Sequence, residues 1–250
     1  MREAVVLAGG LGTRLRSVLP DTPKALAPIQ GRPFLDYLLD YLASQHVEHV
    51  CLALGYRAEK ILERYRSDSS LLPPTSAGFI PQVGRWKGLR LSASIEAEPL
   101  GTGGALAQAL SYLQAPRLFV LNGDTFFPIP LREMEELHTQ RSNPLTLALA
   151  YVSPADRYGL VEVEDGFVIA FHEKEPRPAG WIYGGIALIE ATWWQAQTWP
   201  PRFSWELYLK ETAPTLRPTA YLAQSVPFLD IGVPADYEKA QTFLPRYGSI

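Results

Sequence analysis

Residues 5–24 read VVLAGGLGTRLRSVLPDTPK, an apolar run followed by a glycine-rich turn and several cations. The run from Val5 to Ala8 is typical of a strand that is buried on both faces of a parallel sheet. Glycines directly after such a strand let backbone N–H groups approach an anion or a planar base. Arg14 offers a fork of donors for phosphate, and Lys24 adds a compact positive charge. The stretch predicts a phosphate or nucleotide site; the alternative is an ordinary turn with two solvated cations.

Two better-known glycine motifs are excluded by the residues of this turn. A P-loop ends in Gly-Lys-Ser or Gly-Lys-Thr, whereas this turn continues as Gly12-Thr13-Arg14. A dinucleotide-binding fingerprint that began at Gly10 would need a small residue at position 15, where a helix packs closely on the strand. This chain has Leu15 there, which is too large.

Strands and helices alternate through the first half of the chain. Periodicity predicts strands at 49–54, 89–92 and 118–121, helices at 33–42 and 58–65, and a glycine turn followed by a helix at 105–113. This alternation is typical of a doubly wound parallel sheet. Residues 67–88, rich in serine, proline and glycine, predict a long loop.

The second half of the chain has a different pattern. Leu145, Leu147, Leu149 and Tyr151 alternate with other residues, which indicates half-exposed and partly antiparallel strands. No repeat or linker separates this part from the first. We therefore expect one domain over residues 1–250, with one half at 1–125 and the other at 126–250.

Composition excludes several classes of protein. Of 250 residues, 47% are hydrophobic and 20% are charged, which is typical of a globular protein. The 23 basic and 26 acidic residues give a net charge of −3, which argues against a nucleic-acid partner bound through its phosphates.

No apolar run approaches the roughly 18 residues that span a membrane, and the N-terminus has no signal-peptide layout. The single cysteine, Cys51, excludes an intramolecular disulfide and a zinc knuckle. We expect a soluble cytoplasmic protein without a membrane partner.

The stretch from Leu7 to Leu15, continued by Pro23-Lys24, closely resembles the signature of the sugar-phosphate nucleotidyltransferases, also called nucleoside-diphosphate-sugar pyrophosphorylases. Later stretches resemble that family's motifs in the same order: Glu98–Gly104, Asn122–Asp124, Glu173-Lys174 and Asp230–Gly232. The resemblance implies an α/β fold with a doubly wound, mostly parallel, Rossmann-like sheet and a partly antiparallel sugar-binding lobe. It also makes residues 1–125 the nucleotide-binding half and residues 126–250 the sugar-phosphate-binding half.

The resemblance implies a role for each motif. Residues expected to bind the nucleotide are Leu7, Ala8, Gly9, Gly10, Gly12, Thr13, Arg14, Lys24, Glu98, Gly101, Thr102 and Asn122. Residues expected to bind the sugar phosphate are Tyr158, Gly159, Glu173, Lys174, Gly184 and Gly185. Arg14, Lys24 and Asp124 would be catalytic, and Asp124 and Asp230 would hold Mg²⁺. Taken alone, Glu173 and Lys174 would be a solvated surface pair. Tyr183 stands where relatives often carry asparagine, which puts an asparagine contact to the sugar in doubt.

The two metal aspartates also make physical sense. Asp124 and Asp230 each end an apolar run, at 118–121 and 226–229. Ligands of open α/β sheets gather at the carboxyl ends of strands. Mg²⁺ is usually held by one or two carboxylates together with substrate phosphates. The alternative for each aspartate is a turn-forming residue near glycine.

The expected reaction joins an NTP to a sugar 1-phosphate and releases pyrophosphate. A phosphate oxygen of the sugar attacks the α-phosphorus, and because that oxygen is already an anion no general base is required. Arg14 would neutralise the leaving pyrophosphate, Lys24 the α-phosphate and Lys174 the sugar phosphate. Two other classes compete: a non-catalytic nucleotide-sugar-binding module, and a glycosyltransferase. The latter typically presents Asp-x-Asp, which Asp124-Thr125-Phe126 lacks.

The stretch Glu98–Gly104 resembles the guanylyltransferases that act on heptose and mannose 1-phosphates more than the other branches of the family. We therefore expect GTP as the nucleotide and a heptose or mannose 1-phosphate as the acceptor, with uridylyl, thymidylyl or cytidylyl transfer as alternatives. Guanine presents an N1–H and an amine, so Glu98 or a backbone carbonyl would accept from it. The sequence leaves the oligomeric state open, a homo-oligomer included.

Overall fold

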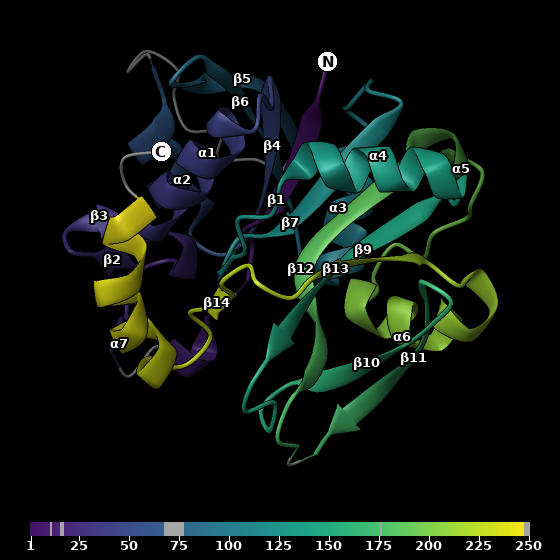
Figure 1. Cartoon of the computed structure of the whole chain (residues 1–250). Helices are drawn as coiled ribbons and strands as arrows, with labels where there is room; N and C mark the ends of the chain where they lie inside the picture. The colour runs from purple at the N-terminus through teal and green to yellow at the C-terminus, as the bar shows by residue number, and fades with distance from the viewer. Residues whose placement is uncertain (11, 16–17, 68–77, 176, 248–250) are drawn as a thin grey trace.

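Ten strands form one sheet in this computed structural model, which describes residues 1–10, 12–15, 18–67, 78–175 and 177–247 (Figure 1). Across the sheet the order is β10-β11-β13-β9-β12-β7-β1-β4-β6-β5. The bounds are β1 Glu3–Leu7, β4 His49–Leu54, β5 Gly78–Trp86, β6 Leu89–Ile95, β7 Arg117–Asn122, β9 Leu145–Val152, β10 Gly159–Glu164, β11 Phe167–Lys174, β12 Gly180–Glu190 and β13 Thr219–Ala223. Two short pairs lie apart: β2 Pro28–Ile29 with β3 Arg32–Pro33, and β8 Thr125–Phe126 with β14 Leu229–Asp230.

Four adjacent strands, β7, β1, β4 and β6, are parallel and form the central part of the sheet. The chain starts at β1, moves outward to β4 and β6, and then returns to place β7 on the other side of β1. Such a reversal leaves a crevice at the carboxyl ends of the two strands beside it, which is where open α/β sheets bind ligands. The segment after β1 and the segment after β7 therefore meet at one edge of the sheet.

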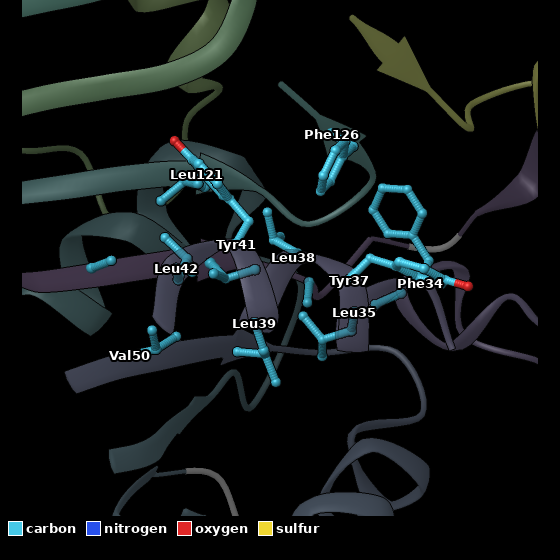
Figure 2. Packing of buried hydrophobic residues seen from close by; sticks show 14 of the residues in the cluster. Phe34, Leu35, Tyr37, Leu38, Leu39, Tyr41, Leu42, Val50, Leu121 and Phe126 are labelled. Carbon is cyan, nitrogen blue, oxygen red and sulfur yellow. The ribbon is translucent and has the colours of Figure 1, made fainter. Parts of the chain in front are cut away.

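Helices cover both faces of the sheet. On one face lie α1 Phe34–Ser44, α2 Ala58–Tyr65, α4 Leu131–Arg141 and α7 Pro234–Phe243. On the other face lie α3 Gly101–Leu110, α5 Ala191–Gln195 and α6 Trp205–Leu216. Figure 2 shows Leu38 and Leu42 of α1 in the same buried cluster as Val50 of β4 and Leu121 of β7. The predicted doubly wound α/β fold is confirmed.

Antiparallel pairing extends the sheet beyond β7. The strand β12 pairs antiparallel with both β7 and β9, and β10 and β11 form a hairpin that projects from the sheet (Figure 1). The pair β9 and β13 is parallel. These pairings confirm the predicted partly antiparallel second lobe, and the one sheet runs through both lobes.

Two local predictions are wrong. Residues 78–86, predicted as part of a loop over 67–88, form β5, which pairs antiparallel with β6; residues 68–77 lie outside the described chain. β5 is an edge strand, where proline and a register shift are tolerated. The predicted glycine turn before residue 105 is instead the first turn of α3, which begins at Gly101.

No helix in the described ranges is both long and apolar enough to cross a membrane.

Three short 3₁₀ turns complete the described elements: η1 Thr13–Leu15, η2 Lys24–Leu26 and η3 Leu244–Tyr247. The first two carry Arg14 and Lys24 to the edge where β1 and β7 end.

Candidate functional site

A cavity of about 360 Å³ opens at the carboxyl ends of β1 and β7. It brings together most of the residues predicted to bind the nucleotide: Leu7, Ala8, Gly9, Gly10, Gly12, Thr13, Arg14, Lys24, Gly101, Thr102 and Asn122, with Asp124 beside them. Leu11, the remaining member of the glycine loop, lies outside the described residues. These side chains come from segments far apart in the chain, so the strand reversal at β1 and β7 is what assembles them.

Gly9 and Gly10 of the loop lack a side chain for different physical reasons. A Cβ on Gly9 would stand 2.6 Å from Oε1 of Glu96 and 2.9 Å from the backbone nitrogen of Gly55. A Cβ on Gly10 would meet nothing within 4 Å. Gly9 is therefore required by packing inside the protein, whereas Gly10 leaves an open backbone face toward the cavity.

Glu96 is a cavity residue that the sequence analysis missed. It follows directly after β6, and its Oε2 accepts a 2.6 Å hydrogen bond from the backbone N–H of Leu100. Burial raises the pKa of the Glu96 carboxyl. The structure places Glu98, the predicted base-side acceptor, on the surface and outside the cavity lining. The signal for Glu96 is its position at the carboxyl end of a parallel strand, where ligand-binding side chains gather.

Two aspartates and a lysine form a charged cluster at the cavity, in which Lys24 and Asp124 belong to the lining and Asp230 lies next to them. Asp124 follows β7, and the pairing of β14 with β8 places Asp230 beside it. The Nζ atom of Lys24 lies 2.5 Å from Oδ2 of Asp124 and 3.7 Å from Oδ1 of Asp230. Burial, and next the negative charge of Asp124, raise the pKa of the Asp230 carboxyl, while the Lys24 ammonium opposes that shift.

The two carboxylates fit a hard divalent cation. Mg²⁺ prefers oxygen ligands and is commonly bound by one or two carboxylates plus substrate phosphates. In the part of the chain that the structure describes, no group of three or more histidine, cysteine, aspartate or glutamate side chains could hold a metal. A metal held by Asp124 and Asp230 would have two carboxylate ligands, the number that commonly holds Mg²⁺ together with substrate phosphates.

Arg14 extends over the same site from η1. Its side chain is exposed and lines the cavity, and no ion pair with a described residue engages it. Its positive charge also favours the ionised form of Asp230, which lowers the pKa of that carboxyl against the larger effect of burial. Arg14 therefore lies where the sequence analysis expected it, on the cavity, and its contact with phosphate stays a prediction.

The first turn of α3 is shaped by a distant segment of the chain. A Cβ on Gly101, whose φ is +71°, would stand 2.5 Å from the carbonyl oxygen of Phe203. That carbonyl accepts a 3.0 Å hydrogen bond from the N–H of Gly103, and the N–H of Phe203 donates to Leu100. The small residues here admit the backbone around Phe203 against the helix.

We expect Gly101→Ala to lower the free energy of unfolding by about 2 kcal/mol or more, because left-handed backbone strain adds to a clash with a backbone atom. Urea denaturation measures this. Gly10→Ala is the matched control, since its Cβ would have open space, and it should keep a stability close to that of the wild type. Equal unfolding midpoints for both variants would contradict the packing argument.

The residues predicted to bind the sugar phosphate do not line the cavity. Tyr158 packs edge-on against Phe228, and Gly185 lies against the side chain of Asn122. Glu173 forms an ion pair with Lys210 of α6. The other predicted members lie on the second lobe: Gly159 at the start of β10, Lys174 exposed at the end of β11, and Gly184 in β12.

Tyr183, the departure from the expected pattern, belongs to the aromatic packing of the second lobe. Its ring packs against the buried cluster on the α6 face, and its hydroxyl is buried beside Trp205. Tyr183 therefore does not line the described cavity.

The chain is similar in sequence and in structure to known nucleotidyl transferases. Residues 3–193 match the model of the nucleotidyl transferase family. The D-glycero-alpha-D-manno-heptose 1-phosphate guanylyltransferase of Aneurinibacillus thermoaerophilus is 38% identical over 98% of this chain and 99% of its own length. The enzyme of that name from Campylobacter jejuni is 37% identical over 94% of this chain and 96% of its own. HddC from Yersinia pseudotuberculosis, crystallised with GMP-PN, superposes with a TM-score of 0.79 at 32% identity, covering 97% of this chain and 99% of that one.

Proposed function

The chain belongs to the nucleotidyl transferase family, and from that premise we propose that it transfers a guanylyl group from GTP to a heptose or mannose 1-phosphate and releases pyrophosphate. The observation that carries the proposal is the cavity at the reversal of the sheet. It is lined by a glycine loop, two cations and Asp124, and Asp230 lies 3.7 Å from one of those cations, Lys24. The names of the two full-length relatives support guanine and heptose. The metal we propose is Mg²⁺. We also propose a cytoplasmic location, where thiols such as that of the free, buried Cys51 stay reduced.

The chemistry requires charge neutralisation more than proton transfer. An oxygen of the sugar phosphate forms a bond to the α-phosphorus of GTP, while the bond from that phosphorus to the bridging oxygen of pyrophosphate breaks. Arg14 would hold the leaving pyrophosphate, and Lys24 would meet the α-phosphate. When bound, Mg²⁺ supplies positive charge to the phosphate oxygens, and Asp124 and Asp230 would hold it. Glu173 and Lys174 would contact the sugar phosphate, as the family motifs imply.

We propose that Glu96 recognises the guanine base through hydrogen bonds. Guanine presents two donors, the N1–H and the exocyclic amine, and the oxygens of a carboxylate are acceptors for such groups. The backbone N–H of Leu100 engages Oε2 and orients the carboxylate, whose other oxygen lies between Gly9 and Gly55. A buried acceptor of this kind disfavours a base that presents an oxygen instead of a donor.

A matrix of GTP, UTP, dTTP and CTP against several sugar 1-phosphates, read by pyrophosphate release, tests the proposal. We expect the largest kcat/KM with GTP, and a loss of about 10- to 100-fold for GTP in Glu96→Gln, because a hydrogen bond to a charged group is removed. Glu98→Gln tests the sequence-based alternative and should have a much smaller effect, since Glu98 lies outside the cavity.

Each contrary outcome removes a different part of the proposal. Equal or faster turnover with UTP, dTTP or CTP would overturn the assignment of guanine and leave nucleotidyl transfer standing. No pyrophosphate from any pair of substrates would overturn the reaction and favour a nucleotide-sugar-binding module.

A further inference from the structure

Glu206 lines the cavity although none of the sequence motifs contains it. It lies in the first turn of α6, and its Oε2 atom accepts two hydrogen bonds. The hydroxyl of Thr102 donates at 2.6 Å and that of Ser204 at 3.0 Å. No donor from a described residue engages its second oxygen, Oε1. The carboxylate is thus held by one oxygen and has the other oxygen available.

The segment before α6 fixes the position of Glu206. The hydroxyl of Thr102 accepts a 2.9 Å hydrogen bond from the backbone N–H of Trp205, whose ring is fully buried. The ring of Phe203 is stacked on Trp199 with an interplanar angle of 5°. Because the start of α6 is tied to α3 by backbone bonds and aromatic packing, Glu206 has a defined place at the rim of the cavity.

The same helix also reaches the second lobe. One turn after Glu206, Lys210 forms an ion pair with Glu173 near the end of β11. The helix α6 contacts both α3 and β11, and it lies beside the hairpin of β10 and β11 in Figure 1. Glu206 therefore stands between the base-side turn of α3 and the lobe that carries the sugar-side motifs.

We propose that Glu206 binds hydroxyl groups of a substrate through Oε1, and this rests on the proposed function above. A carboxylate only accepts hydrogen bonds, and it repels phosphate. The neutral donors of the two substrates are the N–H groups of guanine and the hydroxyls of the ribose and of the sugar ring. Glu96 is assigned to guanine above, which leaves the hydroxyls for Glu206. Its place between the two lobes fits either source, and deoxy substrates distinguish them.

Calorimetric titration and initial rates compare the wild type with Glu206→Ala, Glu206→Gln and the control Glu211→Ala. Glu211 lies on the same helix, is exposed, and does not line the cavity. The ligands are the preferred NTP with its 2′-deoxy and 3′-deoxy forms, and the preferred sugar 1-phosphate with its ring-deoxy forms. We expect the wild type to bind one deoxy form about 10-fold or more weakly than its parent, and Glu206→Ala to lose most of that discrimination.

The set of deoxy substrates for which Glu206→Ala loses discrimination shows whether Glu206 contacts the ribose or the sugar ring. If the discrimination is lost for the deoxynucleotides, Glu206 contacts the ribose; if it is lost for the deoxysugars, Glu206 contacts the sugar. Glu206→Gln should keep its contacts with Thr102 and Ser204 and the melting temperature, and still lose discrimination. The control Glu211→Ala should retain it in full.

Unchanged discrimination in both Glu206 variants would overturn the proposal, as would an equal loss in Glu211→Ala. Binding of the NTP alone is measured without turnover, so this result stands apart from the test of pyrophosphate release. If another NTP replaced GTP as the preferred nucleotide, the same comparison would be made with its deoxy forms.

Discussion

Lys24→Ala and Arg14→Ala are each expected to lower kcat/KM by about 10²–10³, because each removes a cation that offsets charge on the transferring phosphates. The structure places both side chains on the cavity. Lys24 is only 12% exposed, so the substrate phosphates would meet it in a site with little competing water. Pyrophosphate release under saturating and limiting GTP separates the effects on kcat and KM.

The two variants should differ in their effect on the protein without substrate. The ammonium of Lys24 lies close to both Asp124 and Asp230, so its removal leaves two carboxylates facing each other. Lys24→Ala should therefore unfold at a lower temperature than Arg14→Ala when no divalent cation is present. Arg132→Ala, which removes a cation that is 82% exposed on α4, is the control and should match the wild type. Near wild-type turnover for both site variants would remove their assignment to the phosphates.

Asp124→Asn and Asp230→Asn are expected to raise the Mg²⁺ concentration for half-maximal activity by about 10-fold or more. Each exchange replaces an anionic oxygen ligand by a neutral amide oxygen of the same size. Titration of the metal at fixed substrate concentrations measures the shift. Asp165→Asn, in the turn between β10 and β11, removes the same charge from a residue that does not line the cavity and should leave the titration unchanged.

The pair of aspartate variants also tests the two assignments separately. If Asp230→Asn retained the metal affinity of the wild type while Asp124→Asn lost it, Asp124 would be the sole protein ligand of the two. The reverse outcome would assign the metal to Asp230, whose position depends on the pairing of β14 with β8.

Local signals in the sequence were sufficient to predict the parallel strands of the first half of the chain and the glycine loop after β1. The apolar run at 5–8 and the glycines after it predicted the strand and the loop, and the strand at 49–54 has the predicted bounds. Buried parallel strands read as continuous apolar runs, and their ends are marked by glycine, so neighbouring residues are sufficient to find them. Asp124 was found for the same reason, because it follows such a run.

Contacts between distant segments determined the rest. The pairing of β8 with β14 brings Asp230 to Asp124, and the packing of Phe203 on α3 explains why Gly101 must be small. Glu96 and Glu206 carry no local motif; one is identified by its place at the end of β6 and the other by its contact with Thr102. A sequence specifies which side chains are available, but long-range packing and strand pairing decide which of them meet. The local pattern therefore predicted the glycine loop and the cations after it, whereas only the tertiary structure brought Asp230 beside Asp124 and located Glu96 and Glu206 on the cavity.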